Sequence, residues 1–379
     1  MSLRRVRVAE ITLPELAWAE GLRVSLPGRL LAGRVRGDDA IRVDEGLRAA
    51  ALELARDAVS AVRLHAAWTG HPPLSGRLPF SYQRLPPALR MLYAHALGRI
   101  QRWRQARWAA FPGWPLDLSA DFLADLLGGP GAHLRPTPVV LSHDIDSPEG
   151  LHNLMKDFLP LEERFGARST NFVVPRAWPL DHGALGELAA RGHEIGQHGY
   201  DHANRTAFLA PEALAARLDA TGDFVRRHRV SGYRAPSLLR TPALLAALAH
   251  RYAYDSSIPT SGGPFPLPNN GCASARPFIV EGILEIPLSL PRDGTLRFLG
   301  HGARRIARMW IETADIIARS GGVVVLLTHC ERRFSGNPAM LGAYARFLEH
   351  VAAHPERFRF LRARDLQAAG DAGAGAHAS

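Results

Sequence analysis

The sequence predicts an α/β fold in which helices cover a mainly parallel sheet. Short apolar runs alternate with helix-forming segments over residues 136–367. Repeated alternation of strand and helix is typical of βα units, whose parallel strands build either a barrel or a doubly wound sheet. No internal repeat or low-complexity segment interrupts this stretch. We therefore expect it to be one α/β domain.

The strands are predicted where short apolar runs are bounded by polar or turn-forming residues. Two helices between them have clear ends. The helix over 211–227 begins with a proline in its first turn, and the helix over 303–320 is closed by two glycines. The predicted strands span 137–142, 169–174, 193–198, 230–235, 284–289 and 322–329.

Residues 1–135 are expected to form an accessory α+β extension, separate from the sheet. They are polar and rich in arginine, with a strand predicted at 22–35 and helices at 44–67 and 87–110. Residues 368–379 are small and polar, which predicts a disordered tail. The sequence does not indicate what the extension does.

Composition favours a globular protein of the cytoplasm. The chain has 379 residues, of which 46% are hydrophobic, and this is enough for a sizeable core. No run reaches the roughly 20 apolar residues of a membrane span. The first residues lack the continuous apolar stretch of a secretion signal. Two distant cysteines, Cys272 and Cys330, fit a reducing compartment.

The net charge of +10 comes almost wholly from arginine, and such a surface attracts anionic lipid, nucleic acid or acidic glycans. The arginines are scattered and form no recognisable nucleic-acid module, so we do not expect nucleic acid as a partner. Residues 98–111, GRIQRWRQARWAAF, suit a peripheral helix on an anionic membrane. The alternative is a helix that packs its aromatic side chains on the domain and exposes its arginines. The residues concerned are Arg99, Arg102, Trp103, Arg104, Arg107 and Trp108.

Polar residues gather at the carboxyl ends of the predicted strands, where the functional groups of parallel α/β folds cluster. Asp144 and Asp146 follow the first strand in SHDIDS, and His198 and His202 follow the third in HGYDH. Each feature alone also has a structural explanation, such as a helix cap or a core histidine. Their occurrence together predicts one divalent metal, bound by the histidines and one aspartate. This ligand set suits Zn²⁺ best, and Co²⁺, Ni²⁺ or Fe²⁺ would also fit.

The stretch GHEIGQHGYDH, residues 192–202, contains a third histidine, His193. A zincin site is excluded, because Gln197 stands where the second histidine of that motif would be. His193 begins an apolar strand, so we expect it to make a structural hydrogen bond and leave it out of the ligand set.

Five separated motifs resemble, in the same order, those of the polysaccharide deacetylase (NodB-type) superfamily, carbohydrate esterase family 4. GHEIGQHGYDH resembles the second motif, and SHDIDS resembles a variant of the first, with Ile145 between the two aspartates. GYRAPS is similar to the third, YAYDSS stands in the region of the fourth, and LLTH resembles the fifth. The resemblance covers about residues 136–365. It implies a distorted (β/α)7 barrel that deacetylates N-acetylated sugars with one divalent metal, usually zinc.

The resemblance also implies roles at the metal. His198 and His202 would bind it together with Asp146, and Asp144 would be the base that deprotonates the attacking water. The alternative exchanges the two aspartates. In an extended segment alternate residues share a face, so both carboxylates could reach one ion.

Further residues complete the implied site. Arg234 would orient the base, and a backbone N–H near Ser237, in the turn after Pro236, would bind the oxyanion. His329 would be the general acid, with Asp255 as its charge partner.

The expected function is a deacetylase that uses a metal-activated water on an N-acetylated sugar, as a precursor in cell-surface glycan synthesis. The expected cytoplasmic location motivates the precursor, because finished wall polymers lie outside. One alternative is an amide or cyclic-imide hydrolase that acts on a non-sugar substrate with the same barrel. Another is a catalytically silent glycan-binding barrel, which the altered first motif motivates and the presence of Arg234 and His329 disfavours.

Overall fold

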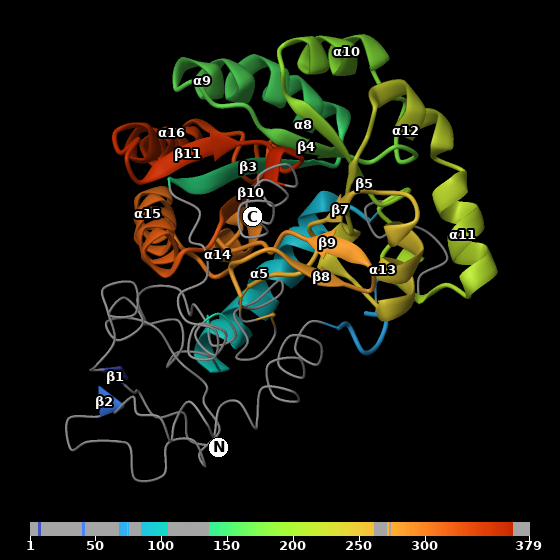
Figure 1. The fold of residues 1–379 in the computed structure, drawn as a ribbon, viewed down its shortest axis with the longest axis horizontal. Coiled ribbons are helices and arrows are strands. Elements are labelled where there is room, and N and C mark those ends of the chain that lie inside the picture. The colour runs from blue at the N-terminus through green and yellow to red at the C-terminus, as the bar shows by residue number, and fades with distance from the viewer. Residues whose placement is uncertain are drawn as a thin grey trace, which may run out of the picture.

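The protein was studied as a computed structural model, which confirms the α/β class (Figure 1). A nine-stranded, mostly parallel sheet curves into a distorted half-barrel, with helices on its outside. The strand predicted at 22–35, the helix predicted at 44–67 and the tail after 367 lie outside the described residues. The structure describes residues 7–8, 40–41, 68–73, 75, 85–104, 118, 121, 136–260, 271–272 and 274–366.

Each of the six predicted strands overlaps an observed one. The sheet order is β10-β3-β4-β5-β6-β7-β9-β8, with β11 beside β3, and β8 and β9 form its one antiparallel pair. The predicted strand at 284–289 is shorter than expected and ends at Glu285. The strands are β3 (Thr137–Ile145), β4 (Thr170–Val173), β5 (Glu194–His198), β6 (Gly232–Arg234), β7 (Tyr254–Asp255), β8 (Phe278–Val280), β9 (Ile283–Glu285), β10 (Val324–His329) and β11 (Phe358–Leu361). A separate pair joins β1 (Arg7–Val8) to β2 (Ala40–Ile41).

Strand β3 is the central strand of the domain and is buried along its whole length. Val139 pairs with both β10 and β11, so these two strands lie on opposite edges of β3. Asp144 pairs with both β10 and β4, so β4 shares its edge with β11. One edge of β3 is therefore divided between two strands: β11 pairs with its amino-terminal half and β4 with its carboxyl-terminal half.

The gap between β9 and β10 is closed by an irregular segment. Ser289 Oγ donates to the Val323 carbonyl at 2.7 Å and accepts from the Val325 N–H at 2.8 Å. The Leu290 N–H then donates to the Val325 carbonyl at 3.1 Å. A serine side chain thus takes the place of a backbone partner at this seam, which distorts the barrel.

The helix predicted at 303–320 is confirmed at both ends as α15 (Ala303–Ser320). The helix predicted at 87–110 is observed as α5 (Pro87–Arg104), and residues 105–110 lie outside the described residues. The other helices are α8 (Pro148–Asn153), η3 (Leu154–Phe158), α9 (Leu159–Arg164), α10 (His182–Ala190), η4 (Thr206–Phe208), α11 (Pro211–Asp219), α12 (Gly222–His228), η5 (Pro236–Leu238), α13 (Pro242–Ala249), α14 (Asp293–Phe298) and α16 (Pro338–Ala352). Among the helices in the described part of the chain, none has the length and apolar character needed to cross a membrane.

The prediction of one helix over 211–227 is wrong, because the chain breaks there into α11 and α12. The break lies at the buried Thr221. Its hydroxyl donates to the Leu218 carbonyl at 2.7 Å and accepts from Gln197 Nε2 at 3.0 Å. A hydroxyl that competes for a helical carbonyl interrupts the helical hydrogen bonds.

Gly232 of β6 allows the Tyr254 ring of β7 to pack against the backbone, and an added Cβ would overlap that ring. We expect Gly232→Ala to destabilise the protein by about 1–3 kcal/mol, because both residues are buried and overpacking forces the structure to shift. Urea unfolding measures the change. Gly186→Ala in α10 is the control, since its Cβ would meet no atom within 4 Å. Equal stability of the two variants would contradict the explanation.

Candidate functional site

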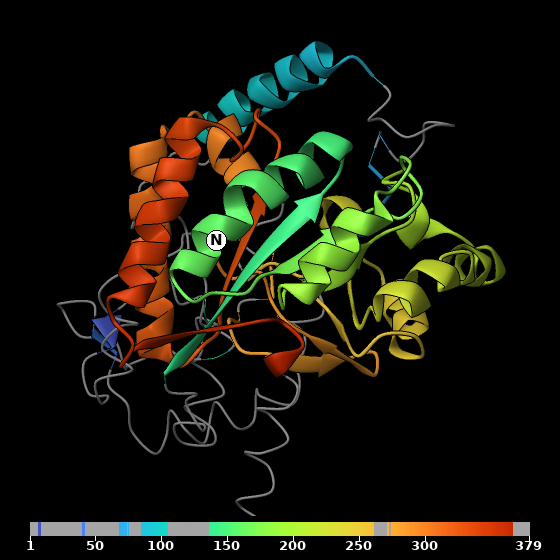
Figure 2. The same cartoon turned by 90° about the horizontal axis from the view of Figure 1, so that it is seen from above.

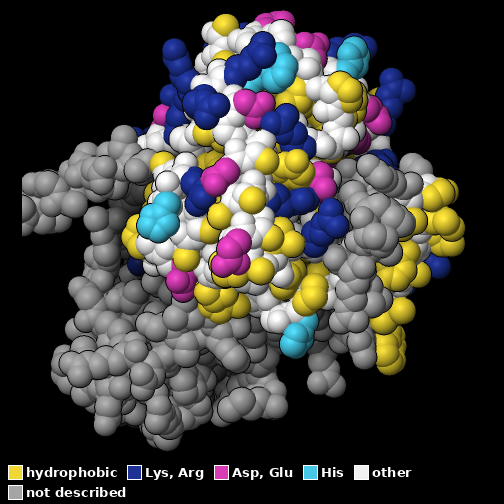
Figure 3. Space-filling view, turned by 90° about the vertical axis from the view of Figure 1, so that its right-hand side faces the viewer, with side chains coloured by type: hydrophobic (Ala, Val, Ile, Leu, Met, Phe, Trp, Pro, Cys, Tyr) yellow, Lys and Arg dark blue, Asp and Glu magenta, His cyan; other side chains and the backbone are white. Residues whose placement is uncertain are grey.

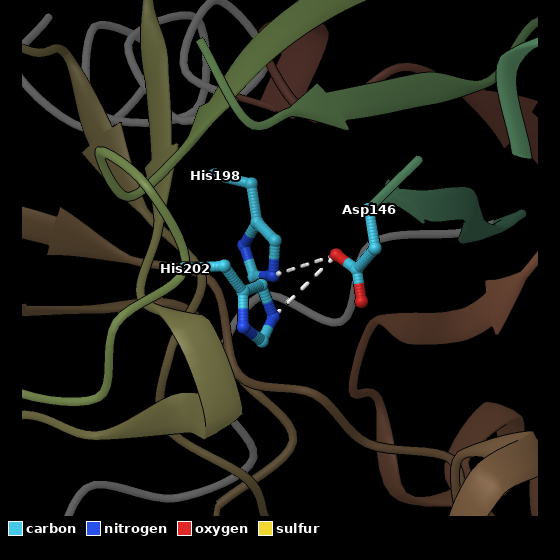
Figure 4. Close-up of side chains that lie close together, drawn as sticks. All are labelled: Asp146, His198 and His202. Carbon is cyan, nitrogen blue, oxygen red and sulfur yellow. Dashed lines mark ion pairs between the residues drawn. The ribbon is translucent and has the colours of Figure 1, made fainter. Parts of the chain in front are cut away.

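Three buried side chains form a candidate metal centre at the carboxyl edge of the sheet. Asp146 follows β3, His198 ends β5, and His202 lies in the loop after β5. Asp146 Oδ1 lies 3.6 Å from His198 Nε2 and 3.5 Å from His202 Nε2, and the three side chains converge on one point (Figure 4). Among the described residues, these three side chains have ligand atoms close enough together to hold one ion, within 4.8 Å of one another.

The spacing of these atoms fits a bound metal. Two ligand atoms at 2.0–2.2 Å from a tetrahedral zinc ion are about 3.4 Å apart, close to both distances. Asp146 Oδ1 is buried and accepts no hydrogen bond, so its lone pairs are unused by the protein. Burial lowers the pKa of His202, which favours the neutral imidazole that a metal requires.

The tautomer of His198 is also set for ligation. Its Nδ1 lies 3.0 Å from the Arg234 carbonyl, which is an acceptor only, so Nδ1 carries the proton and donates it. The lone pair is then on Nε2, the atom that faces Asp146. Metal-binding histidines are commonly oriented by such a hydrogen bond from the other ring nitrogen.

Asp144 lies beside the centre, as the alternation along β3 predicts. Its Oδ2 is 3.5 Å from His198 Nε2, and its Oδ1 accepts from Arg234 Nη1 at 3.1 Å. Burial would raise the pKa of Asp144, but the neighbouring His198, Arg234 and His329 lower it to about 2. Asp144 is therefore an ionised carboxylate held in a fixed orientation.

Arg234 is fully buried, and its guanidinium is held on all sides. Nη1 also donates to Ser142 Oγ at 3.0 Å, and Nε and Nη2 donate to the carbonyl and hydroxyl of Ser256. The group stacks on the Phe172 ring at 4.1 Å. Ser142 and Asp144 reach the same guanidinium because alternate residues of β3 share a face.

His329 ends β10 and pairs with Asp293, the first residue of α14. His329 Nδ1 lies 2.8 Å from Asp293 Oδ1, and the His329 N–H donates to Asp293 Oδ2 at 2.8 Å. Burial alone would lower the pKa of His329, but the charge and hydrogen bond of Asp293 raise it to about 9, with help from Asp146 and Asp144. The imidazole is thus protonated at neutral pH.

The prediction that Asp255 is the charge partner of His329 is wrong. Asp255 Oδ1 accepts from Ser257 Oγ at 2.8 Å, and Asp255 interacts with Glu285 of the neighbouring β9. Burial and the charge of Asp255 raise the pKa of Glu285, so this pair holds a proton inside the barrel.

The turn that holds Pro236 and Ser237 packs against the ligand loop. Gly199, between the two histidines, has a φ of +64°, and an added Cβ would overlap the Pro236 ring. Ser237, Leu238 and His202 have φ values of 54°, 58° and 57°, a region that non-glycine residues seldom adopt. Such strain often accumulates at functional sites, and here it brings the turn proposed for the oxyanion against the histidine loop.

The other polar residues of the GHEIGQH stretch have structural roles. His193 Nδ1 accepts from the Ser169 N–H at 3.0 Å, which confirms the predicted structural hydrogen bond. Glu194 accepts from Thr170 Oγ1 and Tyr254 Oη, at 2.8 and 2.9 Å. Gln197 Nε2 donates to the Gly199 carbonyl and so shapes the loop that carries His202.

Two acidic residues at the carboxyl edge of the sheet were not predicted from the sequence. Asp293 is one, and Glu331 is the other. Glu331 is buried two residues beyond His329, and its Oε1 accepts from Ser147 Oγ at 2.6 Å. Burial and the charge of Asp146 raise the pKa of Glu331 to about 7. Glu331 directly follows the THC stretch, residues 328–330, at the end of the last predicted strand. This position at a strand end could have marked it as a candidate site residue.

Comparison with known proteins agrees with the site. Residues 133–255 match the family model described as polysaccharide deacetylase, and this match includes Asp144, Asp146, His198, His202 and Arg234. This part of the chain is therefore similar to polysaccharide deacetylases, in agreement with the resemblance drawn from the motifs. No curated protein matches the chain.

Solved structures of carbohydrate esterases and deacetylases overlap the chain at low identity. A protein assigned as a polysaccharide deacetylase from Mycobacterium smegmatis is 20% identical, with a TM-score of 0.47 over 59% of this chain and 86% of that one. A family 4 carbohydrate esterase from Streptomyces lividans, in complex with acetate, is 14% identical, with a TM-score of 0.39 over 59% and 91%. Peptidoglycan deacetylase PdaC from Bacillus subtilis is 12% identical, with a TM-score of 0.41 over 64% and 97%.

Proposed function

We propose that this protein is a metal-dependent hydrolase that removes the acetyl group from an N-acetylated sugar or glycan precursor. The observation that carries the proposal is the arrangement of three units at one edge of the sheet. These are the Asp146, His198 and His202 cluster, the Asp144 carboxylate held by Arg234, and the His329 imidazole held by Asp293. Metal-dependent amide hydrolysis uses an ion site, a base and an acid together.

Asp146, His198 and His202 would hold the metal, with zinc first among the ions that fit and Co²⁺, Ni²⁺ and Fe²⁺ as the others. When bound, such an ion polarises the acetyl carbonyl and makes the attacking water more acidic. The three side chains are buried, so they provide a dry, fixed set of donors.

Asp144 accepts a proton from the attacking water, because it is the ionised carboxylate next to the ion site that is not needed as a ligand. Arg234 fixes its orientation and keeps it ionised. His329 donates a proton to the leaving amine, since Asp293 keeps the imidazole protonated. The turn at Pro236 and Ser237 contributes a backbone N–H to the oxyanion that develops on the acetyl oxygen.

The proposed substrate is a precursor of a cell-surface glycan, and the proposed location is the cytoplasm. The family match supports an acetylated glycan as the substrate class. The main alternative remains an amide or cyclic-imide hydrolase with the same barrel. Only the chemistry of the released product separates the two.

The test measures bound metal and acetate release by the full chain after loading with zinc. N-acetylglucosamine oligomers and nucleotide-linked N-acetyl sugars are compared with cyclic imides. We expect about one zinc per chain and acetate release from at least one sugar. Both should be lost in the His198→Ala/His202→Ala double variant, because it removes two of the three ligands.

The control variant is His71→Ala/His152→Ala, which removes two exposed histidines. It should keep the metal and the activity. Bound metal with turnover of imides alone would replace the deacetylase with the alternative hydrolase. Absence of metal in the loaded wild type would reject the enzyme and leave a glycan-binding barrel.

A further inference from the structure

Helix α5 presents a row of exposed hydrophobic side chains. Trp103 is 81% exposed, Leu92 68% and Tyr93 64%. These side chains lie along one side of the helix at helical spacing. The first of them, Leu85, directly precedes the two prolines at the start of the helix. The members of the row are Leu85, Leu89, Leu92, Tyr93, Ile100 and Trp103. We call this row the α5 stripe. Large exposed hydrophobic patches often mark a protein–protein or membrane interaction surface.

The opposite side of α5 is fixed to the domain, so the α5 stripe cannot turn inward. Gly98 is buried against α14, where an added Cβ would overlap the Phe298 carbonyl. The His95 ring meets the Phe298 ring edge-on at 5.8 Å between centroids. The helix therefore has one apolar side on the protein and a second one facing away from it. Figure 3 shows hydrophobic side chains gathered along the right-hand edge of the molecule, the side on which α5 lies.

The α5 stripe lies on the same side of the domain as the candidate site. In Figure 2 the strands β3 and β10 point toward the side on which α5 lies. Helix α14, on which α5 packs, begins at Asp293, the partner of His329. The stripe is thus next to the edge where the acid and the ion site are located.

Basic residues accompany the α5 stripe. Arg99 is exposed within the helix. Four residues separate α14 from α15. The first two turns of α15 expose Arg304, Arg305 and Arg308, and its first turn has no acidic residue. Cations at a helix N-terminus are disfavoured by the helix dipole, so folding of the helix does not account for them. Together these four arginines form what we call the basic rim.

We propose that the α5 stripe and the basic rim dock this protein onto a membrane surface that contains anionic phospholipid. Charge complementarity selects this occupant, because an apolar row flanked by arginines matches the boundary between acyl chains and anionic headgroups. Trp103 and Tyr93 suit that boundary, as each combines an apolar ring with a polar group. The protein would then lie with the carboxyl edge of its sheet toward the lipid.

This orientation implies a class of substrate, and that part of the inference rests on the proposed function. The site would open beside the membrane, so the acetylated sugar it receives is one attached to a membrane lipid. Docking would raise the local concentration of such a substrate and would leave turnover of water-soluble sugars unchanged.

The test is sedimentation of the full chain with vesicles of phosphatidylcholine alone or mixed with phosphatidylglycerol. We expect binding to the mixed vesicles that weakens with salt. Leu92→Ser/Trp103→Ser should weaken it about tenfold or more, since both side chains would leave the lipid. Arg304→Gln/Arg305→Gln/Arg308→Gln should do the same through lost attraction to the headgroups, about tenfold or more.

Matched controls come from other parts of the surface. Ile279→Ser removes a side chain of β8 that is as exposed as Leu92, at 68%. Arg164→Gln/Arg227→Gln/Arg359→Gln removes the same charge from exposed positions at the amino edge of the sheet. Neither control should change vesicle binding by more than about twofold.

Other outcomes would overturn the proposal. Absence of binding to mixed vesicles at low salt would do so directly. A wild type that is dimeric in analytical ultracentrifugation, with a monomeric Leu92→Ser/Trp103→Ser variant, would make a second copy the occupant. Unchanged vesicle binding with a lower melting temperature in that variant would make another segment of this chain the occupant. Acetate release from water-soluble N-acetylglucosamine oligomers, measured alongside, reports on the proposed function separately.

Discussion

Asp144→Asn is expected to lower deacetylation by about 10²–10⁴-fold while the protein keeps its metal, because the variant loses only the base. The asparagine oxygen still accepts from Arg234, so the buried guanidinium keeps that partner. Asp146→Asn is expected to lower metal affinity instead, since Asp146 Oδ1 faces both histidines. Metal content by mass spectrometry and acetate release, measured on both variants, separate the roles.

The contrast between these two variants resolves the exchange of roles that the sequence left open. If Asp144→Asn loses the metal and Asp146→Asn keeps it, the two aspartates have exchanged roles. Urea unfolding of both variants is the control, because a fall in activity counts only for protein that remains folded.

Asp293→Asn is expected to move the alkaline limb of the pH profile of deacetylation to lower pH. The folded pKa of His329 is about 9, above its ordinary value of 6.5, because of the Asp293 carboxylate. The acid form persists in the wild type until the pH rises through about 9. Without that carboxylate, burial lowers the pKa, so the limb moves down by about two pH units and the rate at pH 8 falls by about tenfold.

The same substitution has a stability signature. A raised folded pKa stabilises the native state fully below pH 6.5, and this contribution is lost as the pH rises through about 9. The wild type should therefore exceed Asp293→Asn in unfolding free energy by less at pH 9.5 than at pH 6. Asp255→Asn is the control for the pH profile and should leave the alkaline limb in place. A shift in Asp255→Asn and none in Asp293→Asn would restore the original pairing.

The sequence predicted the parts of the site that depend on local position. Asp144, Asp146, His198, Arg234 and His329 all end or directly follow strands, and parallel strands bring such ends to one edge. Strand ends are visible in a sequence because an apolar run changes there to polar residues. For the same reason the six main strands were found, and the two-residue β7 was not recognised as a strand.

The partner of His329 could not be predicted in this way. Asp293 comes after the irregular Ser289 segment, which leaves β9 and crosses to β10, and no periodic pattern marks such a path. Asp255 was chosen from motif order along the chain, which says nothing of the distance between strands. The break of the 211–227 helix was missed because it depends on Gln197, a residue from another strand.

The seam at Ser289 also links the position of the proposed acid to closure of the barrel. Ser289 joins the last part of the sheet to β10, the strand that ends in His329. Asp293, the partner of His329, follows Ser289 by four residues. The acid and its partner therefore both lie at the seam that closes the barrel. A partly folded chain could already contain β3 to β6, with the ion site and Arg234, and still lack a competent acid. The proposed activity would therefore depend on closure of this seam and not only on the first strands of the sheet.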